Sequence, residues 1–321
     1  MKKFLENGHK KTIFTRNQLK LACMGSLIFG IAPHVFAVEN GGAITPPGIY
    51  DFGSGMTPPP SEYGALGIRF VNVQATTLKD NDGNKSAVKP DFDFNAIVFA
   101  GLKMTDLDFL GGKYGFAAVV PMIDISMDLS IPTPVGNIEQ SGRSTALGDI
   151  QIIPMVVQWN PTENLWLKTE MMFQLPTGSY DPDRVINTGV NHWTFQPSLS
   201  MTYMSPTGFE ISTSSQVNFN TRNKDTDYRS GTEFQQDFGV GQHIGNWIFG
   251  IGGYVYKQLT DDKSETLTNG NRGQAIALGP AIGYVNFRNP IPTIYFHAYK
   301  EFDAQNKTEG TNIALRLGMS F

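Results

Sequence analysis

The chain has 321 residues, with 25 Lys and Arg against 29 Asp and Glu and a formal net charge of −4. Nucleic-acid binding needs clustered cations, and after residue 37 the sequence offers none. The single cysteine, Cys23, excludes a disulfide framework. The 34 glycines, 19 prolines and 12% aromatic residues favour many strands joined by turns.

Residues 1–37 are predicted to be a signal peptide. Six basic residues precede a short apolar run from Leu21 to Ala32, and Val35-Phe36-Ala37 suits cleavage after Ala37. The run is about a dozen residues long, too short for a membrane-spanning helix, and no later segment reaches the required length. A lipoprotein site at Cys23 is disfavoured, because Lys20 stands where an apolar residue is needed. Cleavage leaves 19 Lys and Arg, 28 Asp and Glu, and no cysteine.

Residues 38–62 are predicted to be a leader outside the sheet, since their density of glycine and proline prevents a helix or a ladder strand. The leader is a candidate plug for the interior of a barrel. Twelve strands are predicted for the remainder, 63–321. They are expected at about 63–76, 91–103, 114–130, 147–160, 164–176, 192–204, 208–220, 232–244, 246–258, 273–287, 292–303 and 311–321.

Large apolar residues alternate with small or polar ones along the segments 192–204, 208–220 and 311–321. A soluble sandwich also alternates, so alternation alone does not separate the two folds. In a transmembrane barrel the apolar row faces lipid and the other row faces the lumen. The residues expected to face lipid are Trp193, Phe195, Leu199, Met201, Ile313, Leu315, Leu317, Met319 and Phe321.

The opposite faces are expected to line the lumen, where tyrosines beside small residues would let flat aromatic molecules stack. The lumen candidates are Lys168, Glu170, Glu210, Asp237, Tyr254, Tyr256, Tyr295, His297, Tyr299, Glu301 and Arg316. A pair such as Lys168 and Glu170 is more typical of a structural ladder than of a ligand site.

Short and long connections alternate along the predicted strands. Tight turns are expected at 160–164, 205–207, 245 and 288–291, and long loops at 77–90, 131–146, 177–191, 221–231, 259–272 and 304–310. This alternation places all tight turns at one end of the barrel, as in outer-membrane barrels. Residues 104–112 are an exception, being longer than a tight turn. Together with the signal peptide and the aromatic C-terminus, the pattern predicts an all-β, antiparallel up-and-down transmembrane barrel of about 12 strands in the bacterial outer membrane.

Several short motifs resemble the phenol-degradation meta-pathway outer-membrane family. They are Glu39-Asn-Gly-Gly42, Gly148-Asp149, Leu175-Pro-Thr-Gly-Ser-Tyr180, Asn187-Thr-Gly-Val-Asn-His-Trp193 and Gly252-Gly-Tyr254. The resemblance spans nearly all of the mature chain. It implies a barrel associated with catabolism of aromatic and other hydrophobic compounds, and supplies no binding-site residues.

An enzyme is not expected. The three histidines of the mature chain, His192, His243 and His297, have no serine two positions on, and their spacing does not suit a metal site. Asp80 to Asn84 is better explained as a turn than as a calcium loop. No catalytic residue, metal or cofactor is therefore predicted.

The sequence favours a monomeric conduit for passive uptake of hydrophobic or aromatic small molecules. Its partners would be lipid, that cargo, and the outer-membrane assembly machinery, which would recognise the C-terminal strand. Two alternatives remain open, a non-transporting barrel for structure or surface interaction and an outer-membrane hydrolase.

Overall fold

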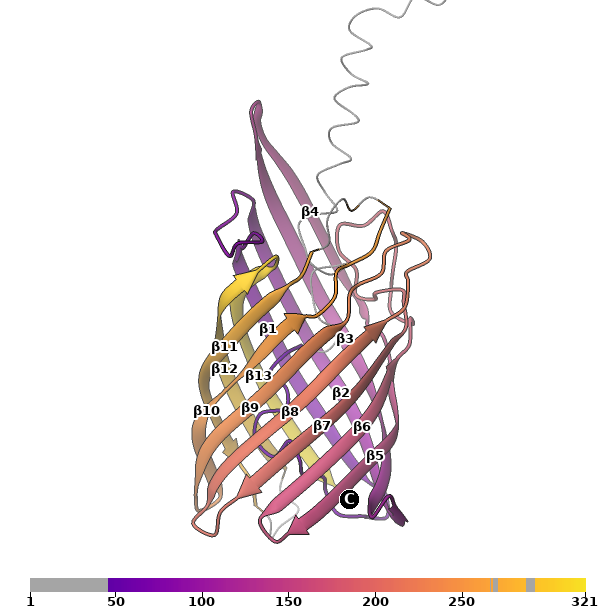
Figure 1. Ribbon diagram of the computed structural model, residues 1–321, viewed down its shortest axis with the longest axis vertical. Helices are drawn as coiled ribbons and strands as arrows, with labels where there is room; N and C mark the ends of the chain where they lie inside the picture. Colours follow the sequence, from indigo (N-terminus) through magenta and orange to yellow (C-terminus); the bar gives the residue numbers. More distant parts are fainter. Residues whose placement is uncertain (1–45, 266, 268–270, 287–291) are drawn as a thin grey trace, which may run out of the picture. The chain divides into compact units, whose positions relative to one another are not determined.

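The computed structural model describes residues 46–265, 267, 271–286 and 292–321 (Figure 1). The predicted signal peptide, residues 38–45 of the leader and the predicted turn 288–291 lie outside this range. The described chain contains no helix long and apolar enough to cross a bilayer.

Thirteen strands make up the described sheet. They are β1 Ala65–Leu78, β2 Lys89–Phe109, β3 Gly112–Thr133, β4 Gly136–Leu147, β5 Gln151–Thr162, β6 Leu165–Gln174, β7 Thr194–Met204, β8 Phe209–Asn220, β9 Glu233–Ile244, β10 Trp247–Gln258, β11 Gln274–Tyr284, β12 Thr293–Gln305 and β13 Thr308–Ser320.

The sheet closes on itself into a barrel. β1 pairs antiparallel with β2 and with β13, and from β5 to β13 each strand pairs antiparallel with the next one in the chain. β3 pairs with both β2 and β5, whereas β4 pairs only with β3. The barrel therefore has twelve strands and β4 is an addition to it, which confirms the predicted antiparallel 12-stranded barrel.

The predicted long loop 131–146 is wrong, because most of it belongs to the hairpin of β3 and β4. Ile131 lies opposite Ile138, and the turn lies between Thr133 and Gly136. The polar residues of β4 conceal the strand in the sequence. Its hairpin extends beyond the barrel, at the end where the long connections gather (Figure 1).

Two further connections are shorter than predicted. β2 and β3 run on to a turn at Leu110 and Gly111, both of which have positive φ, 51° and 77°. This backbone is that of a tight hairpin turn, so the exception at 104–112 disappears. Similarly, β12 and β13 meet at Asn306 and Lys307, and Asn306 has a φ of 50°.

The outer surface of the barrel is broadly apolar. Along β7 and β8, for example, Leu199 is 58% exposed while Ser200 and Ser214 are completely buried inside. Exposed apolar side chains also occur on the outer faces of β1, β2, β10, β12 and β13, among others. A continuous exposed apolar surface of this kind is typical of a barrel embedded in lipid.

The outer face becomes polar where β1 to β4 rise beyond that apolar band. There Asn72 donates to Asn95 over 2.8 Å, and Arg143 forms an ion pair with Asp124 at 2.8 Å. Since these groups need water, this part of the sheet extends beyond the region suited to lipid.

Candidate functional site

The interior of the barrel is the candidate site, and its two sides differ in chemistry. On the side of β6 to β9 the inward side chains are polar and buried, and most of them are bonded to one another, although the side-chain amide of Gln216 has no hydrogen-bond partner among the described residues. Gln196 donates to Asn218 over 2.7 Å, and Ser200 donates to Ser214 over 2.9 Å. These hydrogen-bonded side chains fill this side of the lumen. We call this side the polar wall.

The leader, residues 46–57, runs through the interior along the polar wall (Figure 1). The backbone amides of Gly48 and Tyr50 both donate to the carboxylate of Asp237, at 3.0 and 3.1 Å. The amide of Gly53 donates to Glu210 over 2.8 Å. A segment without its own secondary structure must satisfy its amides elsewhere, and these two inward carboxylates accept from three of them.

Asp51 joins the leader to the opposite strands. Its carboxylate is 2% exposed and lies 3.1 Å from Nη2 of Arg316, 3.0 Å from Nδ1 of His297 and 3.2 Å from the hydroxyl of Tyr299. Arg316 also donates to the carbonyl oxygen of Phe52 over 2.8 Å. Since a buried carboxylate requires such partners, Asp51 is an anchor of the leader rather than a free acid.

Phe52 adds an apolar contact to these polar anchors. Its ring is 1% exposed and packs in a cluster with Ile248, Tyr254 and Tyr299. Glycine at 241 makes room for it, because a Cβ there would lie 2.9 Å from the ring. Burial of a whole phenylalanine side chain stabilises a contact by roughly 1.5–3 kcal/mol, so the leader is held by both packing and charge.

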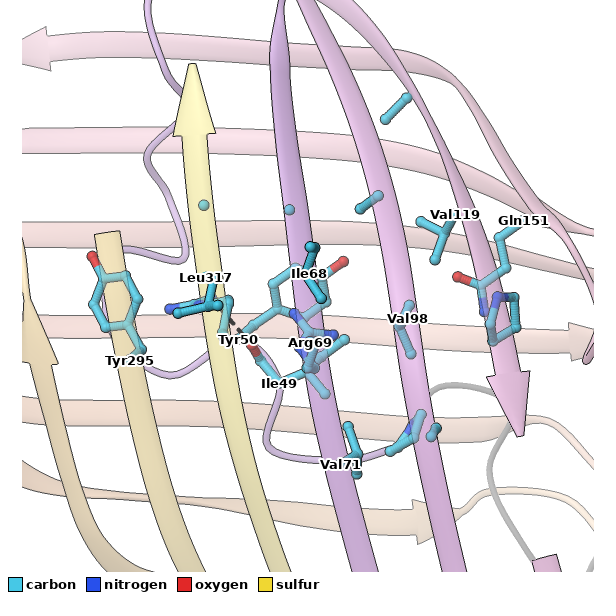
Figure 2. Close-up of a pocket in the computed structure, with 18 of the residues that line it drawn as sticks. Ile49, Tyr50, Ile68, Arg69, Val71, Val98, Val119, Gln151, Tyr295 and Leu317 are labelled. Carbon is cyan, nitrogen blue, oxygen red and sulfur yellow. Dashed lines mark hydrogen bonds between the residues drawn. The ribbon is translucent and has the colours of Figure 1, made fainter. Parts of the chain in front are cut away.

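The side of the lumen formed by β1, β2 and β3 is apolar and encloses open space. This surface, the apolar wall, consists of the inward residues Val71, Val73, Phe94, Ala96, Val98, Ala117, Val119, Ile123 and Ile125. Together with the leader it bounds a cavity of about 1200 Å³ (Figure 2). That volume is at or above the upper end for small-molecule sites, roughly 300–1,000 Å³.

The apolar wall continues beyond the barrel along the inner face of the β3–β4 hairpin. Ile125, Met127, Leu129 and Ile131 are buried in one row, and Ile186 from the β6–β7 loop packs against them. The hairpin is therefore apolar on its inner face and polar on its outer face, whereas the barrel below it is apolar on its outer face. An apolar strip thus runs from the hairpin into the cavity.

Asp149 shapes the loop that reaches over this strip. Its carboxylate accepts from the amides of Thr177, Gly178 and Val190, at 2.9, 2.7 and 2.8 Å. Gly178 lies so close to Gly189 that a Cβ on it would be 2.7 Å from the Cα of Gly189. The Gly148-Asp149 and Leu175–Tyr180 motifs singled out in the sequence therefore fold this loop.

The predicted lumen residues lie mostly inside the barrel, engaged with other protein groups. Lys168 and Glu170 form an ion pair at 3.0 Å. Tyr254 donates to Glu301 over 2.7 Å, and Tyr256 donates to Glu233 over 2.6 Å. The remaining lumen candidates, Glu210, Asp237, His297, Tyr299 and Arg316, hold the leader as described, and Tyr295 lies beneath the guanidinium of Arg316, 4.2 Å from the ring centre.

The residues predicted to face lipid differ in exposure. Trp193, Leu199, Ile313 and Phe321 are all exposed, the lowest of them being Ile313 at 41%. Phe195 stacks on the ring of Phe219 and lies tilted against the ring of Phe173. Met201 and Leu315 are partly buried, and Leu317 and Met319 are partly buried and also border the cavity beside Gly318. The lipid contacts of all nine residues stay a prediction.

Sequence reasoning missed several residues of the cavity. Arg69, Trp166 and Gln151 border it, and none was a candidate. Their strands could have shown them, since Trp166 shares the two-residue period of Lys168 and Glu170, and Arg69 that of Val71 and Val73. Asp51 could not have been found, because the leader has no periodic structure.

The three histidines do not form a hydrolytic arrangement. His243 lies 2.7 Å from Glu210, and Ser212 also donates to Glu210. The carboxylate of Glu210 thus lies between the serine and the histidine. In a catalytic triad the histidine lies between the serine and the carboxylate. Burial lowers the pKa of His192, which contacts the carbonyl of Trp193. Among the described residues, no group of three His, Cys, Asp or Glu side chains could hold a metal ion.

The fold and the interior define a closed β-barrel of the outer-membrane type. A family model described as "Putative MetA-pathway of phenol degradation" matches residues 75–317. The chain belongs to this family, as its motifs indicated. A search of curated proteins finds no match.

Among solved structures, an outer membrane channel from Pseudomonas putida F1 is similar, with a TM-score of 0.70 and 14% identity, over 86% of this chain and 100% of that one. At this identity the likeness establishes the fold alone. The transport unit of the autotransporter AIDA-I from Escherichia coli has a TM-score of 0.48 and 12% identity, over 83% of this chain and 92% of that one.

Proposed function

We propose that the protein is a bacterial outer-membrane channel that admits hydrophobic or aromatic small molecules by passive diffusion, and that it is not an enzyme. The observation that carries this proposal is the 1200 Å³ cavity with its apolar wall. A porin for hydrated solutes would line its open space with polar groups. Here the polar side is filled, and the open side is apolar.

The apolar strip on the β3–β4 hairpin supports the same function. A hydrophobic molecule that enters between the hairpin and the β6–β7 loop, where Met127 and Leu129 are buried, would meet apolar side chains all the way to Val98 in the cavity. Such a path avoids returning the molecule to water. Membership of a family described by phenol degradation, and the structural likeness to an outer membrane channel, point in this direction.

We further propose that the leader is a partial plug. It occupies the interior between the polar wall and the cavity, and it contributes Ile49, Tyr50 and Phe52 to the cavity lining. Passage to the short-turn end would require the leader to shift. The alternative of a purely structural barrel predicts no cargo in the cavity.

The channel proposal is tested by filling the cavity. Val98→Trp adds a bulky ring to the apolar wall, whereas Phe99→Trp on the same strand changes only the outer face, where Phe99 is 44% exposed. Uptake of N-phenyl-1-naphthylamine, followed by its fluorescence, is measured in Gram-negative cells that carry each variant. We expect Val98→Trp to slow uptake several-fold and Phe99→Trp to leave it unchanged. Equal uptake by wild type, Val98→Trp and cells lacking the protein would refute the channel.

A further inference from the structure

One charged residue in the cavity stands apart from the others. Arg69 on β1 faces the open space with Val71 and Ile49 close by, and Figure 2 places it between Tyr295 on one side and Val98, Val119 and Gln151 on the other. A guanidinium is ionised at any physiological pH and presents five N–H donors. It is a costly group to leave in an apolar cavity unless a partner arrives.

The other charged residues of the cavity lining are already satisfied. Glu170 is paired with Lys168 at 3.0 Å, Glu301 with Lys307 at 2.8 Å, and Arg316 with Asp51 at 3.1 Å. Asp149 accepts from backbone amides at distances down to 2.7 Å. Arg69, in contrast, forms no hydrogen bond or ion pair with any part of the chain that the structure describes.

Neither neighbour of Arg69 in the sheet register offers it an opposite charge. Its cross-strand partner in the register is Arg316, a like charge, and its other partner, on β2, is the apolar Val98. Like charges directly opposite one another in a sheet repel. Arg316 is paired with Asp51 of the leader, and the carboxylates of Asp51 and Asp237 act on Arg69 only at longer range. Arg69 is therefore the cation at this level of the cavity that has no direct partner among the described residues.

We infer that Arg69 binds the carboxylate of an apolar monocarboxylic acid, whose hydrocarbon or aromatic part lies on the apolar wall. A planar carboxylate accepts two parallel hydrogen bonds from a guanidinium, a geometry that a neutral phenol or alcohol does not offer. The remainder of the acid contacts Val71, Val98 and Val119. This inference rests on the proposed function and narrows its cargo to one chemical class.

The cavity also accounts for the selectivity of such a site. A fully polar anion gains the ion pair but leaves the apolar wall uncovered, and a neutral hydrocarbon covers the wall but leaves Arg69 with water alone. An amphipathic acid satisfies both. Discrimination therefore comes from an unpaired charge set within apolar surface, which rejects ligands that match only one of the two.

The test compares an acid with its neutral isostere. Binding of 2-naphthoate and of 2-naphthalenemethanol to the detergent-solubilised full-length mature protein is measured by isothermal titration calorimetry. The variants are Arg69→Met, which keeps the length of the side chain without charge, and Arg69→Lys, which keeps the charge. Arg143→Met, on the solvent-exposed hairpin strand β4, is the matched control.

Wild type is expected to prefer the naphthoate. Arg69→Met should weaken naphthoate binding at least about tenfold, which is about 1.4 kcal/mol, and leave naphthalenemethanol binding unchanged. Arg69→Lys should recover part of the loss, and Arg143→Met should behave as wild type. A structural role for Arg69 would instead weaken both ligands equally, and that result would overturn the inference.

The experiment also separates this inference from the channel proposal. If wild type binds naphthalenemethanol and naphthoate equally and Arg69→Met changes neither, the apolar cavity stands and the carboxylate site fails. If wild type binds neither ligand, both ideas fail together.

Discussion

At the scale of single residues, carboxylates determine how irregular segments are held. Asp149, Asp237 and Asp262 each accept at least one backbone amide from a segment outside the sheet. Burial raises the pKa of Asp149, against the effect of the three amides that favour its ionised form. Such residues cannot be replaced by apolar ones without leaving those amides unpaired.

Asp149→Ala is predicted to loosen the β6–β7 loop. The amides of Thr177, Gly178 and Val190 lose a charged acceptor, and hydrogen bonds to charged groups contribute roughly 1.5–3 kcal/mol. We expect these amides to exchange with deuterium at least about tenfold faster. The control is Asp183→Ala in the same loop, where Asp183 is exposed. Unchanged exchange at Gly178 would mean that packing alone holds the loop.

At the scale of elements, the connections at the long-loop end form a bonded layer. Asp262 of the β10–β11 connection accepts from the hydroxyl of Tyr228 over 2.5 Å and from the amide of Gly231 over 2.8 Å. Both donors belong to the β8–β9 connection. One carboxylate therefore ties two neighbouring loops together.

This loop contact is predicted to depend on pH. Burial raises the pKa of Asp262 from 3.8 to about 6. When the loops separate, the carboxyl returns to water and its ordinary pKa. Loop closure is thus most stable below pH 3.8 and weakens as pH rises through about 6, by roughly 3 kcal/mol at most. The exchange protection of the Gly231 amide, corrected for its intrinsic rate, should be higher at pH 5 than at pH 8.

Asp262→Asn provides the control for that dependence. The amide cannot ionise, so protection of Gly231 should lose its pH dependence while remaining measurable. A pH response that persists in Asp262→Asn would assign it to another group.

At the scale of the whole molecule, the lumen is divided into a filled polar wall and an open apolar wall, and in the proposed channel this division decides what the barrel admits. The leader lies along the boundary between them. It contacts β9 and β8 through Asp237 and Glu210, and β13 through Arg316. Its position sets the floor of the cavity and, in the proposed channel, forms the obstruction below it.

Phe52→Ala is predicted to release the leader and raise single-channel conductance in planar bilayers. Truncation of a buried phenylalanine costs about 3–5 kcal/mol. Here that cost would weaken the contact between the leader and the barrel. Phe249→Ala, on the outer face of β10, is the control, since Phe249 is 48% exposed. Conductance equal to wild type, with the leader shown by proteolysis to be released, would contradict the plug.

Much of the architecture could be predicted because strand side chains alternate with a period of two. That period in β7, β8 and β13 assigned each residue to a face, and the alternation of short and long connections indicated a closed antiparallel barrel. Strand β4 was missed because it lies beyond the lipid-facing band, where a polar outer face no longer marks a loop. The end of β12 was missed for the same reason.

The sequence by itself determined the fold class, the number of barrel strands and the family, since each depends on local periodicity or short motifs. Only the tertiary structure decided which inward residues are bonded to other protein groups and which face open space. The pairing of Asp51 with Arg316, 265 positions apart, leaves Arg69 as the cation with room beside it. No local pattern encodes that outcome, because it depends on where a segment without periodic structure comes to rest inside the barrel.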